Sequence, residues 1–526
     1  MNKIENIVIV GGGTAGWMSA TTLISLFPNK KITLVGSPNI KTVGVGESTV
    51  GNINNWMQLV GIEGDEFMPH ADSTYKLSIG FEDFYRKGSG RFHYPFGGVN
   101  MEGNRAGLND WYFKKILYPE TPLSDYAECM FPSMALVTEN KISKNKEGAL
   151  PDFDFLRSTA YQFDAVKFGL WLKEHYCLPR GVNHILAEVK EAPLGSDGIE
   201  HLVLDDGRKI SADLFIDCTG FSALLIDKTL KEPFESYEHI LPNNSAWATK
   251  IPYEDKEKEL VNYTNCTAIA NGWVWNIPLW SRMGCGYVYS NRFISDEEAL
   301  DEFKQHLKEK GYKNVEDLEY EHIPMRVGTH TRTWVKNVCA IGLSGGFMEP
   351  LESLGLNTTM SFLYLLVRTL QRDRVSQWDR DVFNAACKSR YKGSAEFIAL
   401  HYALSHRDDS EYWREISTRE FAPALMKEGV EPRPSTNQFM TAVYDKMEMH
   451  EFRPTEGFHC IATGMNWFPT DMPAVVYSNC NNNIDIKNEF ESFVRRLGQK
   501  KNHWRQIVKD WPSHYQFLKE NFNYHE

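Results

Sequence analysis

A glycine-rich turn near the start of the sequence constrains the fold more than any other feature. The apolar run Asn6–Val10 is typical of a buried β-strand, and the segment Trp17–Leu26 after the turn predicts a helix. Between them, Gly11, Gly13 and Gly16 match the spacing G-x-G-x-x-G. In this setting the glycines allow a tight turn, a close approach of the backbone to a pyrophosphate, and close helix–strand packing. The pattern predicts a Rossmann-like domain that binds a dinucleotide.

Other residues around this turn extend the expected dinucleotide site. Thr14 and Ala15 lie inside the turn, and Lys31–Val35 predicts the second strand of the domain. The acidic residue expected about 20 positions on, which would bond a ribose hydroxyl, is absent, and Ser37 is the candidate that remains. A second glycine-rich segment, Val43–Thr49, suits either a loop along an extended cofactor or a plain surface loop.

Composition bounds the remaining possibilities. The 526 residues are too many for one compact core, so two large lobes are expected. A net charge of −12 argues against nucleic-acid or anionic-membrane partners. No apolar run of about 18 residues predicts a membrane span, and the first residues show no signal-peptide pattern. The nine cysteines form no CxxC pair, which argues against a zinc site or disulfides and favours the reducing cytoplasm. Cys218, Cys339 and Cys460 lie in apolar, strand-like runs and are predicted core residues.

The stretch Phe347–Gly355 forms a second glycine-bearing turn between a predicted strand and a predicted helix. Val338–Gly342 precedes it as a short strand-like run, and Leu356–Leu370 after it is apolar enough for a buried helix. Free N–H groups and the dipole at the start of a helix favour an anion, here a phosphate, a halide or an oxyanion. Glu352 lies in this turn. An ordinary strand–helix turn is the alternative.

Two segments supply candidate pocket residues. Tyr75–Phe81 alternates like a strand, and the residue pattern alone makes Lys76 an exposed strand lysine. Aromatic residues gather shortly afterwards, where they either wall a pocket or fill a core. The candidates in this cluster are His93, Pro95 and Phe96.

A tryptophan-rich strand is predicted at Asn271–Leu279. Trp273 and Trp275 are two positions apart, so they lie on one face of that strand. Two core tryptophans are the simplest interpretation, and Pro278 ends the strand.

These elements predict an α/β fold. Ile210–Gly220 is a late strand that ends in acidic and small residues, as is common where a flavoprotein's cofactor domain resumes after an insertion. We expect a discontinuous, Rossmann-like flavin-binding lobe over residues 1–375. Within it, an inserted β segment at roughly 90–180 contributes to the substrate pocket. A mostly helical substrate-binding lobe is expected over residues 376–526.

Four separated segments together resemble the flavin-dependent tryptophan halogenases. Gly272–Pro278 matches the family's GWxWxIP, and Phe347–Gly355 matches its FxxPxxSxG. Gly11–Gly16 matches its dinucleotide fingerprint, and Gly44–Thr49 is similar to its flavin-strap segment. GWxWxIP is the specific signal, because the fingerprint alone occurs in many families.

The resemblance implies a role for each matched position. Lys76 and Glu352 fall on the active-site lysine and glutamate, and Leu354 and Gly355 fall where backbone amides hold the halide. The implied cofactor is FAD. The positions implied to contact it are Gly11, Gly13, Thr14, Ala15, Gly16, Ser37, Gly46, Glu47, Ser48, Thr49, Val189 and Gly342.

The resemblance also implies a reaction. A separate NAD(P)H-dependent reductase supplies FADH2, which reacts with O2 and with chloride, bromide or iodide to give hypohalous acid. The acid then migrates to Lys76 and Glu352, while Trp273 and Trp275 match tryptophans that keep substrate away from the flavin. A lysine can present such an electrophile, and a carboxylate can orient it and take the proton of the arene. Holding the electrophile at one point gives regioselectivity.

The segment that selects substrate departs from the family pattern. Tryptophan-specific members carry a tyrosine pair, a glutamate and a Phe-Trp pair before a strand similar to Phe458–Ile461. Glu448 and Phe452 keep two of these positions, whereas Thr441–Ala442 and Arg453 replace the others. The departure implies an electron-rich arene of indole or phenol type, and not free tryptophan. A carrier-bound substrate and a homo-oligomer stay open. The competing functions are a flavin-dependent aromatic monooxygenase and a flavin-binding protein without activity.

Overall fold

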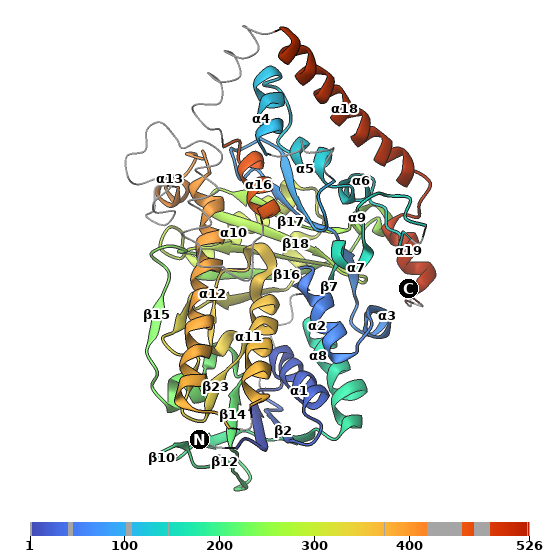
Figure 1. Ribbon diagram of the computed structural model, residues 1–526. Helices are drawn as coiled ribbons and strands as arrows, with labels where there is room; N and C mark the ends of the chain where they lie inside the picture. The colour runs from blue at the N-terminus through green and yellow to red at the C-terminus, as the bar shows by residue number, and fades with distance from the viewer. Residues whose placement is uncertain are drawn as a thin grey trace. The chain divides into compact units, whose positions relative to one another are not determined.

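The computed structural model describes residues 3–39, 46–100, 108–145, 147–372, 374–417, 455–467, 484–522 and 524. The chain divides into two compact units, and segments of the two alternate along the sequence (Figure 1). The first unit comprises Met1–Ser73, Gln162–Ala246 and Ile323–Ala395. The second unit comprises Thr74–Tyr161, Trp247–His322 and Glu396–Glu526.

The first unit is built around a six-stranded sheet. Its strand order is β22-β23-β14-β1-β2-β8, and all neighbours are parallel except β22 and β23. The strand at its centre is almost wholly apolar and buried, as expected for a parallel sheet covered on both faces. The strands are β1 (Asn6–Val10), β2 (Lys31–Gly36), β8 (Asn183–Leu186), β14 (Leu214–Asp217), β22 (Trp334–Val335) and β23 (Val338–Ala340).

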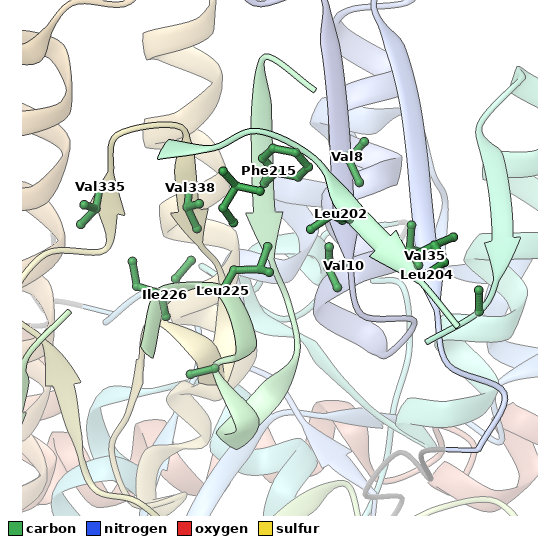
Figure 2. Packing of buried hydrophobic residues seen from close by; sticks show 14 residues of the cluster. Val8, Val10, Val35, Leu202, Leu204, Phe215, Leu225, Ile226, Val335 and Val338 are labelled. Atoms are coloured by element: carbon green, nitrogen blue, oxygen red, sulfur yellow. The ribbon is translucent and has the colours of Figure 1, made fainter. Parts of the chain in front are cut away.

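An apolar cluster covers one face of this sheet (Figure 2). Val8 and Val10 are two positions apart on β1 and so point to the same face. They meet Leu202 and Leu204 of β12 (Leu202–Leu204), which belongs to a small separate sheet with β9 (Val189–Glu191) and β13 (Lys209–Ile210). The cluster thus packs against the strand that leads into the glycine turn.

Helices and short strands around the sheet carry most of the other candidate residues of the first unit. The helix predicted after Phe347–Gly355 is confirmed, and it begins two residues earlier than expected, at Leu354. These elements are α1 (Thr14–Leu26), β3 (Glu47–Ser48), α2 (Asn52–Val60), β7 (Ala160–Phe163), α8 (Ala165–Trp171), β24 (Gly346–Phe347), α11 (Leu354–Leu370) and the first part of α12 (Gln377–Ala403).

The second unit contains most of a seven-stranded sheet in the order β20-β16-β19-β18-β17-β5-β6. Neighbouring strands β17 and β5 run parallel, whereas β18 pairs antiparallel with β17 and β19. The helix α10 (Asp296–Glu309) packs its apolar face on this sheet through Phe303. The strands are β5 (Ser78–Glu82), β6 (Arg91–Pro95), β16 (Ser245–Ile251), β17 (Tyr263–Ile269), β18 (Gly272–Pro278), β19 (Met283–Tyr289) and β20 (Tyr320–Pro324).

Several helices and the short strand β4 (Thr74–Lys76) complete the second unit. The long helix α18 packs on α5 and α6, and α16 packs on β6. In the described part of the chain, no helix is both long enough and apolar enough to span a membrane. The helices are α4 (Leu108–Leu117), α5 (Asp125–Met130), α6 (Ser133–Thr138), α9 (Lys256–Glu259), α13 (Glu411–Ile416), α16 (Thr455–Gly464), α18 (Ile484–Val508) and α19 (His514–Asn521).

The mixed α/β architecture is confirmed, but the compact units follow the sequence differently from the predicted domains 1–375 and 376–526. The reason is strand pairing. Strands β5 and β6 belong to the same sheet as β16, β17, β18 and β19, so residues 74–161 and 247–322 fall in the same unit. The assignment of cofactor and substrate roles to whole lobes stays a prediction.

The prediction that Cys218, Cys339 and Cys460 are core residues is confirmed in all three cases, although one of the three runs is not a strand. Cys339 lies in β23 and Cys218 directly follows β14, and both are buried. Cys460 is also buried, but Phe458–Ile461 is part of helix α16 and not a strand. A short apolar run does not distinguish a strand from one buried turn of helix.

Candidate active site

The glycine turn between β1 and α1 leaves no room for a side chain at two of its glycines. Gly11 has φ +120°, and a Cβ there would lie 2.2 Å from the carbonyl oxygen of Cys218. A Cβ on Gly16 would lie 1.9 Å from the carbonyl oxygen of Gly11. Gly13, the N-cap residue of α1, has no side chain that could bond the first amides of the helix. The residues present fit a dinucleotide phosphate at this helix end.

Three more predicted cofactor residues, Thr14, Ala15 and Gly342, lie at the same helix end. Gly342 has φ +75°, and a Cβ there would lie 2.8 Å from the Cβ of Ala15. The hydroxyl of Thr14 donates to the carbonyl oxygen of Ala165 at 3.0 Å, which ties the start of α1 to α8. Small residues at 15 and 342 therefore keep the approach to the helix open.

At the carboxyl edge of the sheet, the structure shows a residue that the sequence interpretation missed. The hydroxyl of Ser37 donates to Oε1 of Glu188 at 3.2 Å, and Nδ2 of Asn39 donates to the same oxygen at 2.9 Å. Glu188 stands two residues beyond β8, the parallel neighbour of β2. A carboxylate thus occupies the edge at which an acidic residue was expected after β2. The signal that could have revealed it is an acidic residue just beyond another parallel strand of the sheet.

Val189, also predicted to contact cofactor, begins β9 and pairs with Leu204 of β12. Its backbone therefore has a structural role in the small sheet, and its contact with FAD stays a prediction.

The strap segment contacts the turn before α11. Gly46 has φ +101°, and Glu47 pairs with Phe163 of β7. The hydroxyls of Ser48 and Ser353 are 3.2 Å apart and share a hydrogen bond. Thr49, the residue after Ser48, is buried. Burial raises the pKa of Glu47 to about 7, so this carboxyl group can hold a proton near neutral pH.

The turn before α11 places two successive residues in the left-handed region. Glu352 has φ 69° and ψ 6°, and Ser353 has φ 57° and ψ 38°. Such conformations cost roughly 1–3 kcal/mol each for residues other than glycine and gather at functional sites. Ser353 caps α11 without a side-chain bond to the helix, so no side-chain cap covers the amides of Leu354 and Gly355. The buried Glu352 and this helix start lie together in the first unit.

Lys76 is buried, contrary to the exposed strand position that its residue pattern alone predicts. Its side chain has 0% exposed surface, and Nζ lies 5.3 Å from the ring centre of Phe96. β5 and β6 place Pro95 opposite Ser78, two residues beyond Lys76. The hydroxyl of Ser78 lies 3.0 Å from Nδ1 of His93. Phe96 thus lies beside the lysine, whereas His93 and Pro95 lie opposite the strand that follows it, all within the second unit.

His93 is neutral at physiological pH, because burial lowers its pKa to about 3, with a smaller contribution from Arg91. His93 therefore contributes an uncharged ring that hydrogen-bonds Ser78, and no positive charge.

Trp273 and Trp275 lie on one face of β18, as predicted. Their rings form an edge-to-face pair with centres 6.3 Å apart. Gly286 on β19 is opposite Trp275, and a Cβ there would lie 2.1 Å from the indole ring. Both indole N–H groups are buried without a hydrogen-bond partner in the described part of the chain. The function of this pair as a barrier beside the flavin stays a prediction.

The structure does not bring the remaining predicted residues together in one site. Glu448 and Phe452 lie outside the described residues, as do Thr441–Ala442 and Arg453. Lys76 belongs to the second unit and Glu352 to the first, so their meeting at one substrate stays a prediction.

Comparison with known proteins supports one family over nearly the whole chain. The family model described as tryptophan halogenase matches residues 6–477. KtzR, the 7-chloro-L-tryptophan 6-halogenase of Kutzneria sp. (strain 744), is 33% identical over 536 residues, covering 97% of this chain and 98% of that protein. SttH, the tryptophan 6-halogenase of Streptomyces toxytricini, is 35% identical over 442 residues, covering 80% and 82%. The apo structure of VirX1 has a TM-score of 0.89 at 36% identity and covers 99% of each chain. The matched range includes the glycine turn, the tryptophan strand and the turn before α11.

Proposed function

This chain belongs to the flavin-dependent tryptophan halogenase family, and we propose that it halogenates an indole ring with Lys76 and Glu352 as the catalytic pair. It is an enzyme, and its family implies a flavin and a halide. The observation that carries the proposal is the complete burial of Lys76 beside the ring of Phe96. Lysine is almost never fully buried without a specific reason, because desolvating the ammonium is costly. A flat, electron-rich substrate is the kind of ligand that aromatic rings such as that of Phe96 would bind.

The first unit has the groups to hold the cofactor. Amides at the start of α1 would bind the pyrophosphate of FAD, and Glu188 with Ser37 would accept and donate hydrogen bonds at a ribose. When bound and reduced by a separate flavin reductase, the flavin supplies, with O2 and halide, the oxidised halogen as hypohalous acid. The strap residues Ser48 and Thr49 would lie along it.

Halide and substrate would then be handled by two sets of groups. The amides of Leu354 and Gly355, at the positive end of α11, would hold the halide. Lys76 would hold the hypohalous acid by a hydrogen bond to its oxygen. As the carbon–halogen bond forms, the oxygen–halogen bond breaks, and the departing hydroxide takes a proton from the Lys76 ammonium and leaves as water. The ring proton passes to the carboxylate of Glu352, and a proton then returns to the Lys76 amine by way of solvent, which restores both groups. One fixed position of the electrophile selects one ring carbon.

The choice of substrate rests on two opposed observations. KtzR and SttH are named for tryptophan, which favours an indole ring over a phenol. Thr441–Ala442 and Arg453 replace the aromatic residues expected of a tryptophan clamp, which favours a substituted indole over the free amino acid. The indole ring is common to both, and a direct competition between L-tryptophan and substituted indoles separates them.

The test is mass spectrometry of reaction products. The enzyme, FAD, a flavin reductase with NADH, and air are offered L-tryptophan, substituted indoles and phenols, with chloride, bromide or iodide supplied singly. We expect a halide-dependent mass gain that is lost in Lys76→Ala. It should be retained in the control Lys313→Ala, whose lysine side chain is 73% exposed. Flavin binding should be equal in both variants.

The competing function is a flavin-dependent aromatic monooxygenase. A gain of one oxygen without any halide, unaffected by Lys76→Ala, would establish that function instead. The burial of Lys76 and the paired indole rings of Trp273 and Trp275 favour the halogenase. We also place the enzyme in the cytoplasm, in keeping with scattered cysteines that form no CxxC pair.

A further inference from the structure

The strand that carries Lys76 is held from behind by the C-terminal helix. β4 is only three residues long. The backbone N–H of Tyr75, the residue before the lysine, donates to Nε2 of His514 at 3.1 Å. His514 is the first residue of α19, the red helix beside α9 in Figure 1. A side chain near the end of the sequence therefore accepts a hydrogen bond from the peptide next to the proposed catalytic lysine.

The imidazole of His514 is fixed in one tautomer. A backbone N–H can only donate, so Nε2 must be the acceptor and the ring proton lies on Nδ1. Nδ1 is 3.2 Å from the carbonyl oxygen of Leu260, to which it donates. The ring is completely buried, and burial lowers its pKa to about 4, so it is neutral under ordinary conditions.

The helix start that presents this ring is itself anchored. Ser513 and Gln516 form a capping box, in which each side chain bonds the backbone N–H of the other residue. The backbone N–H of His514 donates to the carbonyl oxygen of Asn140 at 2.9 Å. Asn140 also donates from Nδ2 to the carbonyl oxygen of Leu260, at 3.2 Å. The backbone N–H and the Nδ1–H of His514 are thus both held by one connected group, Asn140 and Leu260.

Hydrogen bonds also hold the residue after Lys76 and the first residue of β4. The backbone N–H of Leu77 donates to the carbonyl oxygen of Asn262 at 2.8 Å. The hydroxyl of Thr74 donates to the carbonyl oxygen of Pro278 at 2.6 Å. Because the peptides on both sides of Lys76 are tied, the direction of its side chain is set by these bonds.

Aromatic packing fixes Tyr75 further. Its ring centre lies 5.2 Å from that of Phe155 and 5.6 Å from that of Tyr161. Phe517 and Phe522, from α19 and the residue after it, lie at 6.0 and 6.3 Å. Successive strand residues point to opposite faces, so a Tyr75 held in this cluster directs Lys76 the other way, where it meets Phe96.

We propose that His514 is a positioning residue for Lys76, and that the C-terminal helix is part of the apparatus that aims the catalytic lysine. The inference rests on the proposed function of Lys76. His514 contacts neither substrate nor flavin in this proposal; it acts through the peptide of Tyr75. A lysine displaced by about 1 Å can lose roughly 100-fold in rate.

Two substitutions separate the two hydrogen bonds of His514. In His514→Gln, the amide oxygen reaches the Nε2 position and can still accept from Tyr75. In His514→Asn, the shorter amide reaches only the Nδ1 position, where it can donate to Leu260. Each variant keeps one bond and loses one, so we expect similar falls in melting temperature.

The measured quantity is coupling, the ratio of halogenated product to NADH consumed, with Lys76→Ala alongside. We expect coupling within about threefold of the parent in His514→Gln, and a loss of about 30-fold or more in His514→Asn. Flavin binding should be unchanged in both, since the cofactor residues lie in the first unit. His401→Gln, which removes another fully buried imidazole of the second unit, should lower the melting temperature and leave coupling intact.

The outcomes are distinguishable. Equal coupling in His514→Gln and His514→Asn would make His514 a purely structural residue and overturn the inference. Halogenation that survives in Lys76→Ala would instead overturn the proposed function. Hydrogen exchange on the parent enzyme gives a test that needs no variant: the amide of Tyr75 should be protected like those of β5, and rapid exchange there would also overturn the inference.

Discussion

At Glu352, which like Ser353 has a left-handed backbone, substitutions can test backbone strain and the carboxylate separately. A left-handed conformation costs an ordinary residue roughly 1–2 kcal/mol relative to glycine. We predict that Glu352→Gly melts no lower than the parent, while halogenation falls by about 100-fold or more through loss of the carboxylate. Thermal melts and product formation measure the two effects. Glu352→Gln is the control, because it keeps the left-handed strain: it should lose activity with no relief of strain to offset a loss of stability. A Gly variant that melts well below the parent would mean that the turn is held by the Glu352 side chain.

Glu188 is the residue whose role was least visible in the sequence. We predict that Glu188→Gln weakens FAD binding by about tenfold, because hydrogen bonds to charged groups contribute about 1.5–3 kcal/mol. Quenching of flavin fluorescence on titration measures this directly. Asp206→Asn is the matched control, since it removes another exposed carboxylate of the first unit, one paired with Arg208. Equal affinities in the two variants would leave the ribose contact to Ser37 or to backbone groups.

At the scale of elements, β3 carries a pH-dependent contribution through Glu47. Its pKa is raised by burial from 4.5 to about 7, so between these values the folded protein keeps a proton that the unfolded chain has released. Stability from this group is therefore present below pH 4.5 and lost as pH rises toward 7. We predict that Glu47→Gln gains in melting temperature relative to the parent over this range, and that the gain levels off above pH 7.

Melting curves of flavin-free protein from pH 4.5 to 8 make the measurement. Glu235→Gln is the control, because that side chain is 46% exposed in a surface ion pair. A parallel pH dependence in the Glu47 variant and the parent would contradict the prediction.

The elements that the sequence predicts well are those with a long or regular pattern. The strand, glycine turn and helix at Asn6–Leu26 and the helix after Gly355 appear as expected, because local periodicity and glycine spacing determine them. Phe458–Ile461 is too short for its period to decide between strand and helix. The burial of Lys76 could not be foreseen from its own segment, because it depends on packing against residues elsewhere in the sequence, such as Phe96. Glu188 was missed for the same reason, as it reaches the edge of β2 from a strand about 150 residues away.

At the scale of the molecule, a buried network of charges joins distant parts of the second unit. The carboxylate of Asp125 on α5 lies 2.6 Å from Nζ of Lys114 on α4 and 3.5 Å from Nζ of Lys501 on α18. Its side chain is 7% exposed. Removing one partner of a buried ion pair costs about 3–5 kcal/mol, because the remaining charges stay desolvated.

We therefore predict that Asp125→Asn lowers the melting temperature and speeds hydrogen exchange along α18. The exposed Asp301→Asn on α10 is the control and should change neither. Unaltered exchange in α18 would show that its apolar contacts with α5 and α6 suffice to hold it.

The bond between Tyr75 and His514 has a consequence for how the enzyme is made. The two residues are 439 positions apart. A ribosome adding about 5–20 residues per second needs roughly 20–90 s to travel that distance. The lysine strand therefore waits for this time before its partner exists. A message truncated by a late stop codon before His514 would yield a protein that keeps the glycine turn after β1. It would lack the hydrogen bond that positions the strand of Lys76. Such a product would consume reductant while delivering its oxidant to no particular carbon.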